Sequence, residues 1–287
     1  MDGILVINKE KDMTSRDVVN KVCHILKTKK VGHTGTLDPM ATGVLVLGIN
    51  KGLKIINYLV SLDKEYEAKI VLGINTDTLD ITGNVLEESN IDNINNEDID
   101  KVLNSFIGEY DMEVPIYSAI KVNGKKLYEY ARNNEKVELP VKKVNIYELK
   151  RTSDIESKDN KASFSIKCKV SKGTYIRSLI RDIAKRLNTI GVMSELNRTK
   201  QGKFDIKDSY SLKDLEENNY KLLSIKDCLD IPMYEVSDDL LNKVLNGNKI
   251  PNIYNEKRLG FTKNNELLAI YIEDDENKDI FRPEKVL

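Results

Sequence analysis

Strict alternation of apolar and polar side chains predicts several β-strands along the chain. The clearest stretch is 162–170, where the even-numbered positions from Ala162 to Val170 are apolar and the odd-numbered ones are serine or lysine. A period of two places successive side chains on opposite faces of a sheet, so we expect one buried and one exposed face. The stretch 64–72 alternates in the same way and places Tyr66 among the apolar residues. Further strands are expected at 3–8, 43–48, 141–150, 258–262, 267–273 and 280–287.

Apolar residues spaced three and four positions apart predict helices elsewhere. One is expected to begin after Thr14, which can act as an N-cap with Asp17 three residues later, and to end at the positive run 27–30. A second is expected after Gly173. Its apolar face comprises Ile176, Leu179, Ile180, Ile183 and Leu187, and a basic stripe repeats every four residues at Arg177, Arg181 and Lys185. Other helices are expected at 51–60, 98–107, 125–132 and 238–245.

The order of these elements indicates the fold class. Strands and helices do not alternate regularly, which favours an α+β fold with a mixed, mainly antiparallel sheet and flanking helices over a doubly wound fold. The composition turns acidic near 231–232, and short strands follow, so we expect a large domain at 1–230 and a small β-rich domain at 231–287. Residues 87–97 are rich in Asn, Asp and Glu and are expected to form a surface loop, and 123–124 is an Asn-Gly turn.

Composition narrows the class of protein further. Of the 287 residues, 40% are hydrophobic and 32% are charged, which suits a soluble protein with a substantial core. No apolar run reaches the roughly 18 residues of a membrane span, and the first residues lack the basic leader and cleavage site of a signal peptide. The three cysteines are an odd number and lie far apart, which indicates a reducing compartment, so we expect a cytoplasmic protein. No zinc-ligand spacing is present, and we expect no metal site.

The net charge of -1 conceals an uneven distribution of charge along the chain. Between residues 121 and 203 there are 21 Lys/Arg and 9 Asp/Glu, a net of +12, whereas residues 206–287 carry 12 against 17, a net of -5. A basic middle segment inside a neutral chain favours a polyanionic partner such as nucleic acid. The alternative is that these lysines only solvate exposed faces, which holds for most of them taken singly.

One glycine-rich stretch, Gly32–Gly48, presents a carboxylate on a stiff loop. Pro39 fixes its own φ and keeps Asp38 out of helical geometry. The apolar run Val44–Leu47 predicts a buried strand that anchors the loop. Aspartate is ionised at neutral pH, so it needs correct placement rather than a base to act as a nucleophile. The alternative is a turn in which Asp38 only caps backbone N–H groups.

The same stretch resembles the signature loop of the TruB family of tRNA pseudouridine synthases. From Gly32 onward it matches every specified position of that family's pattern, G-H-x-G-T-L-D-P-x-A-T-G-V-L. Three more segments match: 64–66 fits K-x-Y, 172–179 fits K-G-T-Y-I-R-S-L, and 115–132 fits P-x-Y-S-A-x-K-x-x-G-x-x-x-Y-x-x-A-R. Neither a P-loop nor a G-x-G-x-x-G dinucleotide motif is present.

The resemblance extends over about residues 3–205 and has two departures. Thr76, Thr78, Asp80 and Gly83 fit a T-x-T-x-D-x-x-G pattern. Val114 stands where the family often has a second proline, and Asn197 interrupts the usual leucine-arginine pair, leaving Leu196 and Arg198 on either side. The last 55 or so residues match only loosely, as a small β-rich module of the PUA type.

The resemblance implies roles for three residues. Asp38 attacks the nucleotide covalently, Tyr66 lines the pocket, stacks on the target base and helps to remove the C5 proton, and Arg177 pairs with Asp38. From the residues alone, Tyr66 could be ordinary strand packing and Arg177 could belong only to the basic stripe. His33 is expected to fill the stacking space that the flipped base vacates, or else only to hydrogen-bond the loop. The residues expected to contact RNA are His33, Thr36, Lys64, Tyr117, Lys121, Arg132, Lys172, Tyr175 and Arg181.

The implied function is isomerisation of the T-loop uridine at position 55 of tRNA to pseudouridine, with no cofactor or metal. The N1–C1′ bond breaks, the uracil turns, and C5 joins C1′; Asp38 would attack C1′ or C6, or the reaction would pass through elimination at C2′. The flipped target must leave the loop stack, which an RNA loop permits at low cost. The expected protein is a stand-alone monomer that binds the T-arm. The alternatives are a non-catalytic RNA-binding or RNA-folding protein and a guide-RNA-dependent pseudouridine synthase of the same superfamily.

Overall fold

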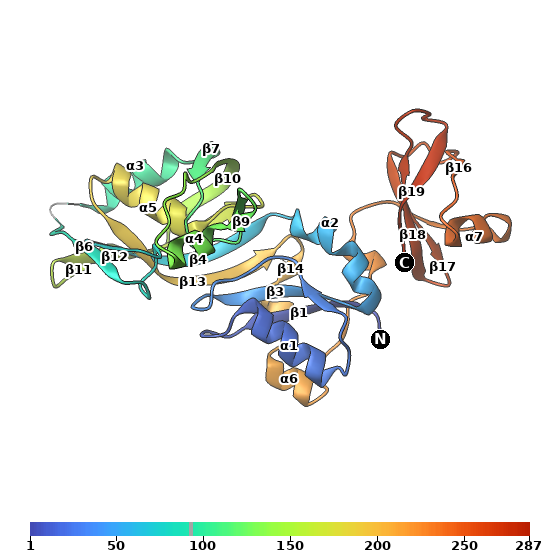
Figure 1. Ribbon diagram of the computed structural model, residues 1–287, viewed down its shortest axis with the longest axis horizontal. Coiled ribbons are helices and arrows are strands. Elements are labelled where there is room, and N and C mark those ends of the chain that lie inside the picture. Colours follow the sequence, from blue (N-terminus) through green and yellow to red (C-terminus); the bar gives the residue numbers. More distant parts are fainter. Residues whose placement is uncertain (92–93) are drawn as a thin grey trace.

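One large sheet organises most of the chain in the computed structural model, which describes residues 1–91 and 94–287 (Figure 1). Its main strands lie in the order β1–β3–β13–β4–β12–β10–β7. Every neighbouring pair is antiparallel except β3 and β13, so the predicted mixed, mainly antiparallel sheet is confirmed. The bounds are β1 Gly3–Lys9, β3 Thr42–Ile49, β13 Gly191–Gln201, β4 Lys64–Leu72, β12 Lys161–Val170, β10 Val141–Arg151 and β7 Gly108–Glu113. Shorter strands pair at its margins: β2 Val31–His33, β11 Glu156–Lys158 and β14 Phe204–Asp205.

Helices cover the two halves of this sheet differently. The bounds are α1 Ser15–Ile25, η1 Asn50–Ile55, α2 Ile56–Val60, α3 Asn96–Asn104, α5 Ile176–Arg186, η2 Ile206–Asp208, α6 Leu212–Glu216 and η3 Lys226–Cys228. β1 and β3 are buried on both faces, by α1 and α6 on one side and by η1 and α2 on the other, which explains their continuous apolar runs. α3 and α5 cover β4, β10 and β12 on one face only, and these strands accordingly alternate. Thr14 caps α1 with the predicted Asp17 partner.

The two halves of the sheet meet at the parallel contact between β3 and β13. Only Asn197 with Thr42 and Arg198 with Gly43 pair there. Gly43 has a φ of 101°, and a Cβ at this position would collide with the carbonyl oxygen of Arg198. Glycine is therefore required where the two halves join. The loop that carries Asp38 ends at this junction.

The structure contains a central strand, β13, that the hydrophobic pattern did not predict. Its pairing with β4 shifts register twice, between Met193 and Glu195 and between Arg198 and Lys200. Each bulge adds a residue and moves the following side chains to the other face, so the strand shows no period of two.

The region 74–132 differs from the prediction in its element boundaries. The expected loop at 87–97 begins inside a short strand, and its residues 92–93 lie outside the described part of the chain. The short strands here are β5 Ile74–Thr76, β6 Val85–Glu88, β8 Lys121–Val122 and β9 Lys125–Lys126. β8 and β9 pair across the predicted Asn-Gly turn, so helix α4 begins at Leu127, two residues later than expected, and ends at Arg132.

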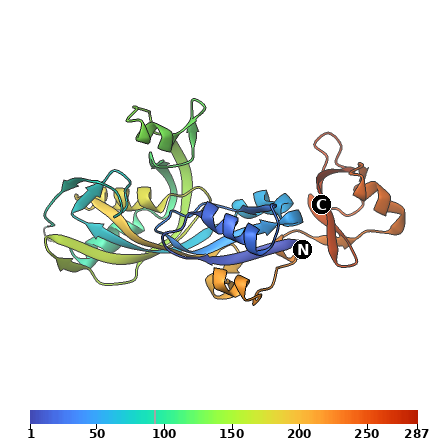
Figure 2. The ribbon, with the colours of Figure 1, turned by 60° about the horizontal axis from the view of Figure 1, so that its bottom comes forward.

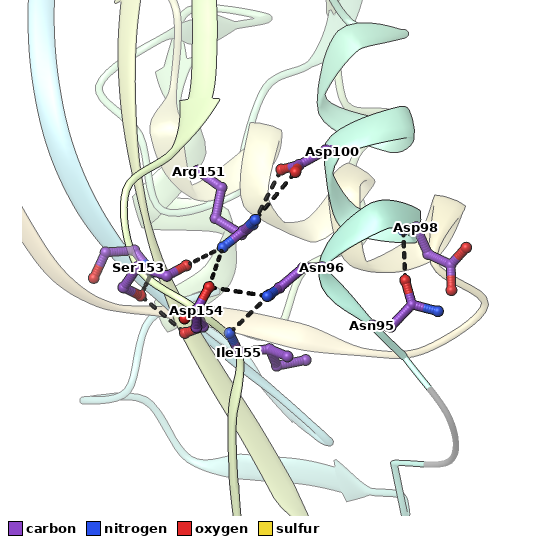
Figure 3. Close-up of polar contacts among 9 residues, drawn as sticks. Asn95, Asn96, Asp98, Asp100, Arg151, Ser153, Asp154 and Ile155 are labelled. Atoms are coloured by element: carbon purple, nitrogen blue, oxygen red, sulfur yellow. Dashed lines mark hydrogen bonds and ion pairs between the residues drawn. The ribbon is translucent and has the colours of Figure 1, made fainter.

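Helix α3 begins at Asn96, two residues earlier than predicted, because polar contacts fix its start (Figure 3). The Asn95 side chain accepts from the N–H of Asp98 at 3.0 Å. Asn96 donates to Asp154 at 2.9 Å, and Arg151 at the end of β10 binds Asp100 through two nitrogens at 3.0 and 3.1 Å. These contacts tie α3 to the turn that follows β10.

A second, five-stranded sheet forms the C-terminal part, in the order β15–β17–β18–β19–β16 (Figures 1 and 2). The bounds are β15 Met233–Glu235, α7 Asp238–Leu245, β16 Ile250–Pro251, β17 Arg258–Lys263, β18 Glu266–Glu273 and β19 Ile280–Val286. The three predicted strands and the helix are thus confirmed. Leu267 and Ile270 of β18 share an apolar cluster with Ile55 and Leu59, so this sheet is packed against η1 and α2.

Across residues 1–91 and 94–287, no helix combines the length and apolar character needed to cross a bilayer. Cys23, Cys168 and Cys228 are all free thiols.

Candidate active site

The loop at 34–41, between β2 and β3, is held at several points along its backbone. The N–H of Thr34 donates to the carbonyl of Val46 at 3.0 Å, and the N–H of Leu37 donates to the Ser15 hydroxyl at 2.8 Å. The N–H of Ala41 closes a turn on the Asp38 carbonyl at 3.0 Å. Asp38 therefore sits on a fixed backbone, as the pattern of Gly and Pro predicted.

Arg177, the second residue of α5, binds the Asp38 carboxylate with two nitrogens. Its Nη2 lies 3.0 Å from Oδ1 and its Nε lies 2.9 Å from Oδ2. Nη1 also donates to the carbonyl of Thr78 at 3.0 Å and Nη2 to that of Tyr117 at 3.1 Å. A guanidinium fixed by four contacts can hold a carboxylate in one orientation. The Asp38 side chain is still 31% exposed, so a ligand can reach it.

The Thr78 carbonyl is presented by the turn at 76–83, which is organised by a buried carboxylate. Asp80 accepts from the Thr78 hydroxyl and the Thr82 N–H, both at 3.0 Å, and from the Thr82 hydroxyl. Leu79 adopts a φ of 62°, a left-handed conformation that is costly for a leucine. The matched T-x-T-x-D segment thus supports the arginine that holds Asp38.

Tyr66 is buried on β4 beside Arg198 of β13, its partner in the strand pairing. Burial raises the pKa of Tyr66, while the positive charge of the neighbouring Arg198 guanidinium opposes the rise. Arg198 Nε also donates to the Val44 carbonyl at 2.6 Å and Nη2 to the Gly35 carbonyl at 3.3 Å. Tyr66 and Asp38 are near enough for the carboxylate charge to affect the phenol.

Lys9 is a buried cation beneath the same loop. Its ammonium donates to the carbonyl oxygens of Glu10 at 2.8 Å, Met13 at 2.7 Å and Pro39 at 3.1 Å. Burial lowers the pKa of Lys9 to about 8, against the attraction of Asp38. Lys9 was not predicted, because a lysine at the end of a strand looks like a solvated one in sequence.

Comparison with known proteins identifies the family to which these site residues belong. Residues 23–176 match the model of the TruB family pseudouridylate synthase N-terminal domain. Residues 177–231 match that of the tRNA pseudouridylate synthase B C-terminal domain. The chain belongs to the TruB family. It is therefore a pseudouridine synthase, an isomerase that rearranges uridine, rather than a non-catalytic RNA-binding protein.

Two curated TruB-family relatives show how far the similarity extends. The tRNA pseudouridine synthase B of Staphylococcus saprophyticus is 42% identical over 99% of both chains. That of Caldanaerobacter subterraneus is 44% identical over 89% of this chain and 88% of its own. Among solved structures, a Cbf5–Nop10–Gar1 complex matches with a TM-score of 0.71 and 22% identity, over 99% of this chain and 84% of that one. At that identity the match supports the fold alone.

Within this TruB-family chain, four of the residues predicted to contact RNA have exposed side chains. Thr36 and Lys172 are exposed on the two segments that meet at the Asp38–Arg177 pair, and Lys121 and Arg132 are exposed on the 115–140 segment. We call this segment, which includes β8, β9 and α4, the arm; Figure 2 shows it projecting from the sheet.

Three other predicted residues lie partly buried at the site. Tyr117 accepts from Arg177 through its carbonyl, and burial raises the pKa of Tyr175, which lies near Asp38 and Arg177. His33 has a buried Nδ1 without a hydrogen-bond partner among the described residues. Burial, then the charges of Arg16 and Arg198, lowers its pKa and favours the neutral ring.

Lys64 has contacts that differ from the expected RNA contact. It is buried, and its ammonium donates to the carbonyls of Val60 at 2.9 Å and Leu62 at 2.6 Å. Burial lowers the pKa of Lys64 to about 8. A phosphate would have to replace both carbonyls, so the structure gives Lys64 the role of closing the end of α2.

The predicted basic stripe on α5 is wrong as a continuous surface. Arg177 is buried on Asp38, and only Lys185 is fully exposed. Arg181 binds Glu113 at 2.7 Å and Asp182 at 2.9 Å, so its charge is largely balanced within the protein. The prediction failed because helical spacing shows which residues share a face of the helix, but not which other parts of the protein cover that face.

Proposed function

We propose that this TruB-family enzyme converts uridine 55 in the T-loop of tRNA to pseudouridine. The observation that carries the proposal is the Asp38 carboxylate, held by two nitrogens of Arg177 and still partly exposed. The curated relatives at 42% and 44% identity are named for tRNA, which supports tRNA as the substrate here. In that loop the target base can leave its stack at low cost.

Each group at the site has a place in this reaction. The N1–C1′ bond breaks, the uracil turns, C5 bonds to C1′, and the C5 proton is lost. Asp38 supplies the reacting carboxylate, and Arg177 orients it. In the proposed reaction, Tyr66 packs against the base and takes the C5 proton, and its position near Asp38 supports this role. The neutral His33 ring suits the apolar space that a flipped base leaves behind.

The charge distribution supports a T-arm bound by the enzyme alone. The arm and the exposed Lys172 lie in the segment with the net charge of +12, which suits the phosphates of a stem-loop. We propose that the enzyme acts as a monomer, with no guide RNA, obligate protein partner, metal or cofactor. We also propose a catalytic domain at 1–230, a small PUA-like domain at 231–287, and the cytoplasm as its location, where thiols stay reduced.

The test uses a bare T-arm hairpin labelled with tritium at C5 of the target uridine. The wild-type chain should release the tritium without any guide RNA, and Asp38→Asn should bind the hairpin yet release none. Asp12→Asn is a matched control, because Asp12 is exposed on a neighbouring loop at a φ of 65° that asparagine tolerates. Tritium release by Asp38→Asn at the wild-type rate would refute the assignment, and a wild type that requires a guide RNA would refute the stand-alone function.

A further inference from the structure

Arg198 is a buried cation that neither the sequence patterns nor the proposed reaction assigns to a role. It is 1% exposed and lies on β13 where the two halves of the sheet join. Burying a guanidinium is costly unless its donors are satisfied. Its hydrogen-bond partners are two backbone carbonyls, and the residue directly opposite it in the pairing of β13 with β4 is Tyr66, so the groups around its positive charge are neutral.

The positions of these two carbonyls are informative. Gly35 precedes Asp38 by three residues and Val44 follows it by six, so one guanidinium binds the backbone on both sides of the catalytic loop. Tyr66 lies directly opposite Arg198 on the neighbouring strand, near enough for the guanidinium to lower the pKa of the phenol. The planar fork of an arginine can serve three directions at fixed angles, which a lysine cannot.

We propose that Arg198 is a positioning residue that holds the Tyr66 hydroxyl in register with the Asp38 loop and acts on the reaction through Tyr66. The inference rests on the proposed function, in which Tyr66 takes the C5 proton.

The electrostatics at Tyr66 support this arrangement. To accept the C5 proton, Tyr66 must first give its own proton to solvent; the C5–H electron pair then stays in the uracil ring and the proton bonds to the phenolate oxygen. The other titratable groups near Tyr66, Cys168 on β12 and Asp38 on its loop, both disfavour the phenolate. Arginine can only donate, so Arg198 is the group that favours the ionised form.

A double-mutant cycle separates this role from simple structural support. The variants are Arg198→Lys, Tyr66→Phe and the double substitution, and the readout is single-turnover tritium release from the labelled hairpin. We expect Arg198→Lys to slow release about 10- to 100-fold, which is part of the roughly 10²- to 10⁴-fold that a positioned acid or base contributes, with hairpin affinity changed less than about twofold. In the Tyr66→Phe background the same change should alter the residual rate by less than about twofold.

Arg151→Lys is the matched control for losing a well-bonded arginine. Arg151 binds Asp100 and Asp154 on the α3 side of the sheet, so its replacement should lower stability without changing the release rate. Equal slowing by Arg198→Lys in both Tyr66 backgrounds, or no slowing at all, overturns the inference. A wild type without tritium release instead overturns the proposed function, so the two failures are distinguishable.

A second measurement decides the matter even if Arg198→Lys does not fold. Tyr66→Phe removes one hydroxyl, and the 15N–1H signals of the arginine Nε groups can be compared between it and the wild type. One slowly exchanging arginine signal should shift, because the hydroxyl is lost from the residue directly opposite Arg198. Unchanged arginine signals would show that Arg198 does not contact Tyr66, and would overturn the inference.

Discussion

At the scale of single residues, the site depends on positively charged side chains that are buried rather than exposed to solvent. Arg177, Arg198 and Lys9 all surround the one loop that carries Asp38, and each donates to backbone carbonyls. A buried cation is costly unless its donors are bonded, so each such residue fixes the geometry of the groups it touches. The loop is thereby rigid without any regular secondary structure of its own.

Lys9 makes this cost measurable as a dependence of stability on pH. Its folded-state pKa of about 8 lies below the ordinary 10.5. Below pH 8, Lys9 is charged in both the folded and the unfolded protein, and the folded protein is destabilised by the full free-energy cost of burying that charge. Between these values the unfolded chain binds more protons, so the free energy of unfolding should rise with pH.

We therefore expect the stability of the wild type relative to Lys9→Met to increase from pH 8 to about 10.5, measured by urea denaturation of both proteins. Lys64, whose pKa is also about 8, is present in both and cancels. A stability difference that stays constant over this range would show that Lys9 is not a buried charge.

The sequence could predict residues of the site only where a motif fixed their spacing. The matched patterns selected Asp38 and Arg177, which the structure joins, and Tyr66, which lies beside them. Lys9 was missed because a charged residue at the end of a strand normally faces solvent, and only the tertiary structure shows otherwise. Arg198 was given no role because its strand, β13, was not predicted. Lys64 was expected to contact RNA because it matches the K-x-Y pattern, which does not show that its ammonium binds two backbone carbonyls.

At the scale of elements, the turn at 76–83 has a strained backbone at Leu79 and positions the Thr78 carbonyl to accept from Arg177. Leu79 has a φ of 62°, while asparagine tolerates this region far better. Leu79→Asn should raise the free energy of unfolding by about 0.5–1 kcal/mol, since it relieves backbone strain. Urea denaturation measures the change.

Ile81→Asn is the control, because it makes the same kind of substitution at an exposed position without a positive φ, and it should not raise the free energy of unfolding. A gain in both variants would argue against strain at Leu79.

The elements themselves were predictable where one periodicity persisted. β12 was predicted within one residue and α1 begins directly after Thr14 as predicted, because alternation and a capping box are local signals. α1 ends at Ile25, before the positive run 27–30 at which its end was expected. β13 was not, because two bulges interrupt its alternation. The start of α3 depends on Asn96 and Arg151, which lie 55 residues apart in sequence and meet only after folding.

At the scale of the whole molecule, charge is segregated along a single continuous body. The C-terminal sheet is packed against η1 and α2 through Leu267 and Ile270, and η1 and α2 also cover β3, the strand that follows the catalytic loop. Residues 206–287 carry 12 Lys/Arg against 17 Asp/Glu, whereas residues 121–203 carry 21 against 9. RNA phosphates should therefore be bound by the middle segment, and the C-terminal part should contribute little electrostatic attraction.

This segregation predicts how salt affects hairpin binding. Each phosphate neutralised by a cation adds roughly 0.7–0.9 to the slope of log affinity against log salt concentration. Lys121→Ala, on the exposed arm, should therefore reduce the slope by about that amount. Lys278→Ala is the matched control, since Lys278 is equally exposed but lies in the acidic C-terminal part. Filter-binding titrations from 50 to 200 mM salt, about the range in which phosphate contacts change affinity strongly, measure both slopes. Equal reductions of the slope in the two variants would mean that the RNA contacts both parts of the molecule. A reduction confined to Lys121→Ala would locate the bound phosphates on the arm. It would also explain why the net charge of the whole chain does not indicate a nucleic-acid substrate.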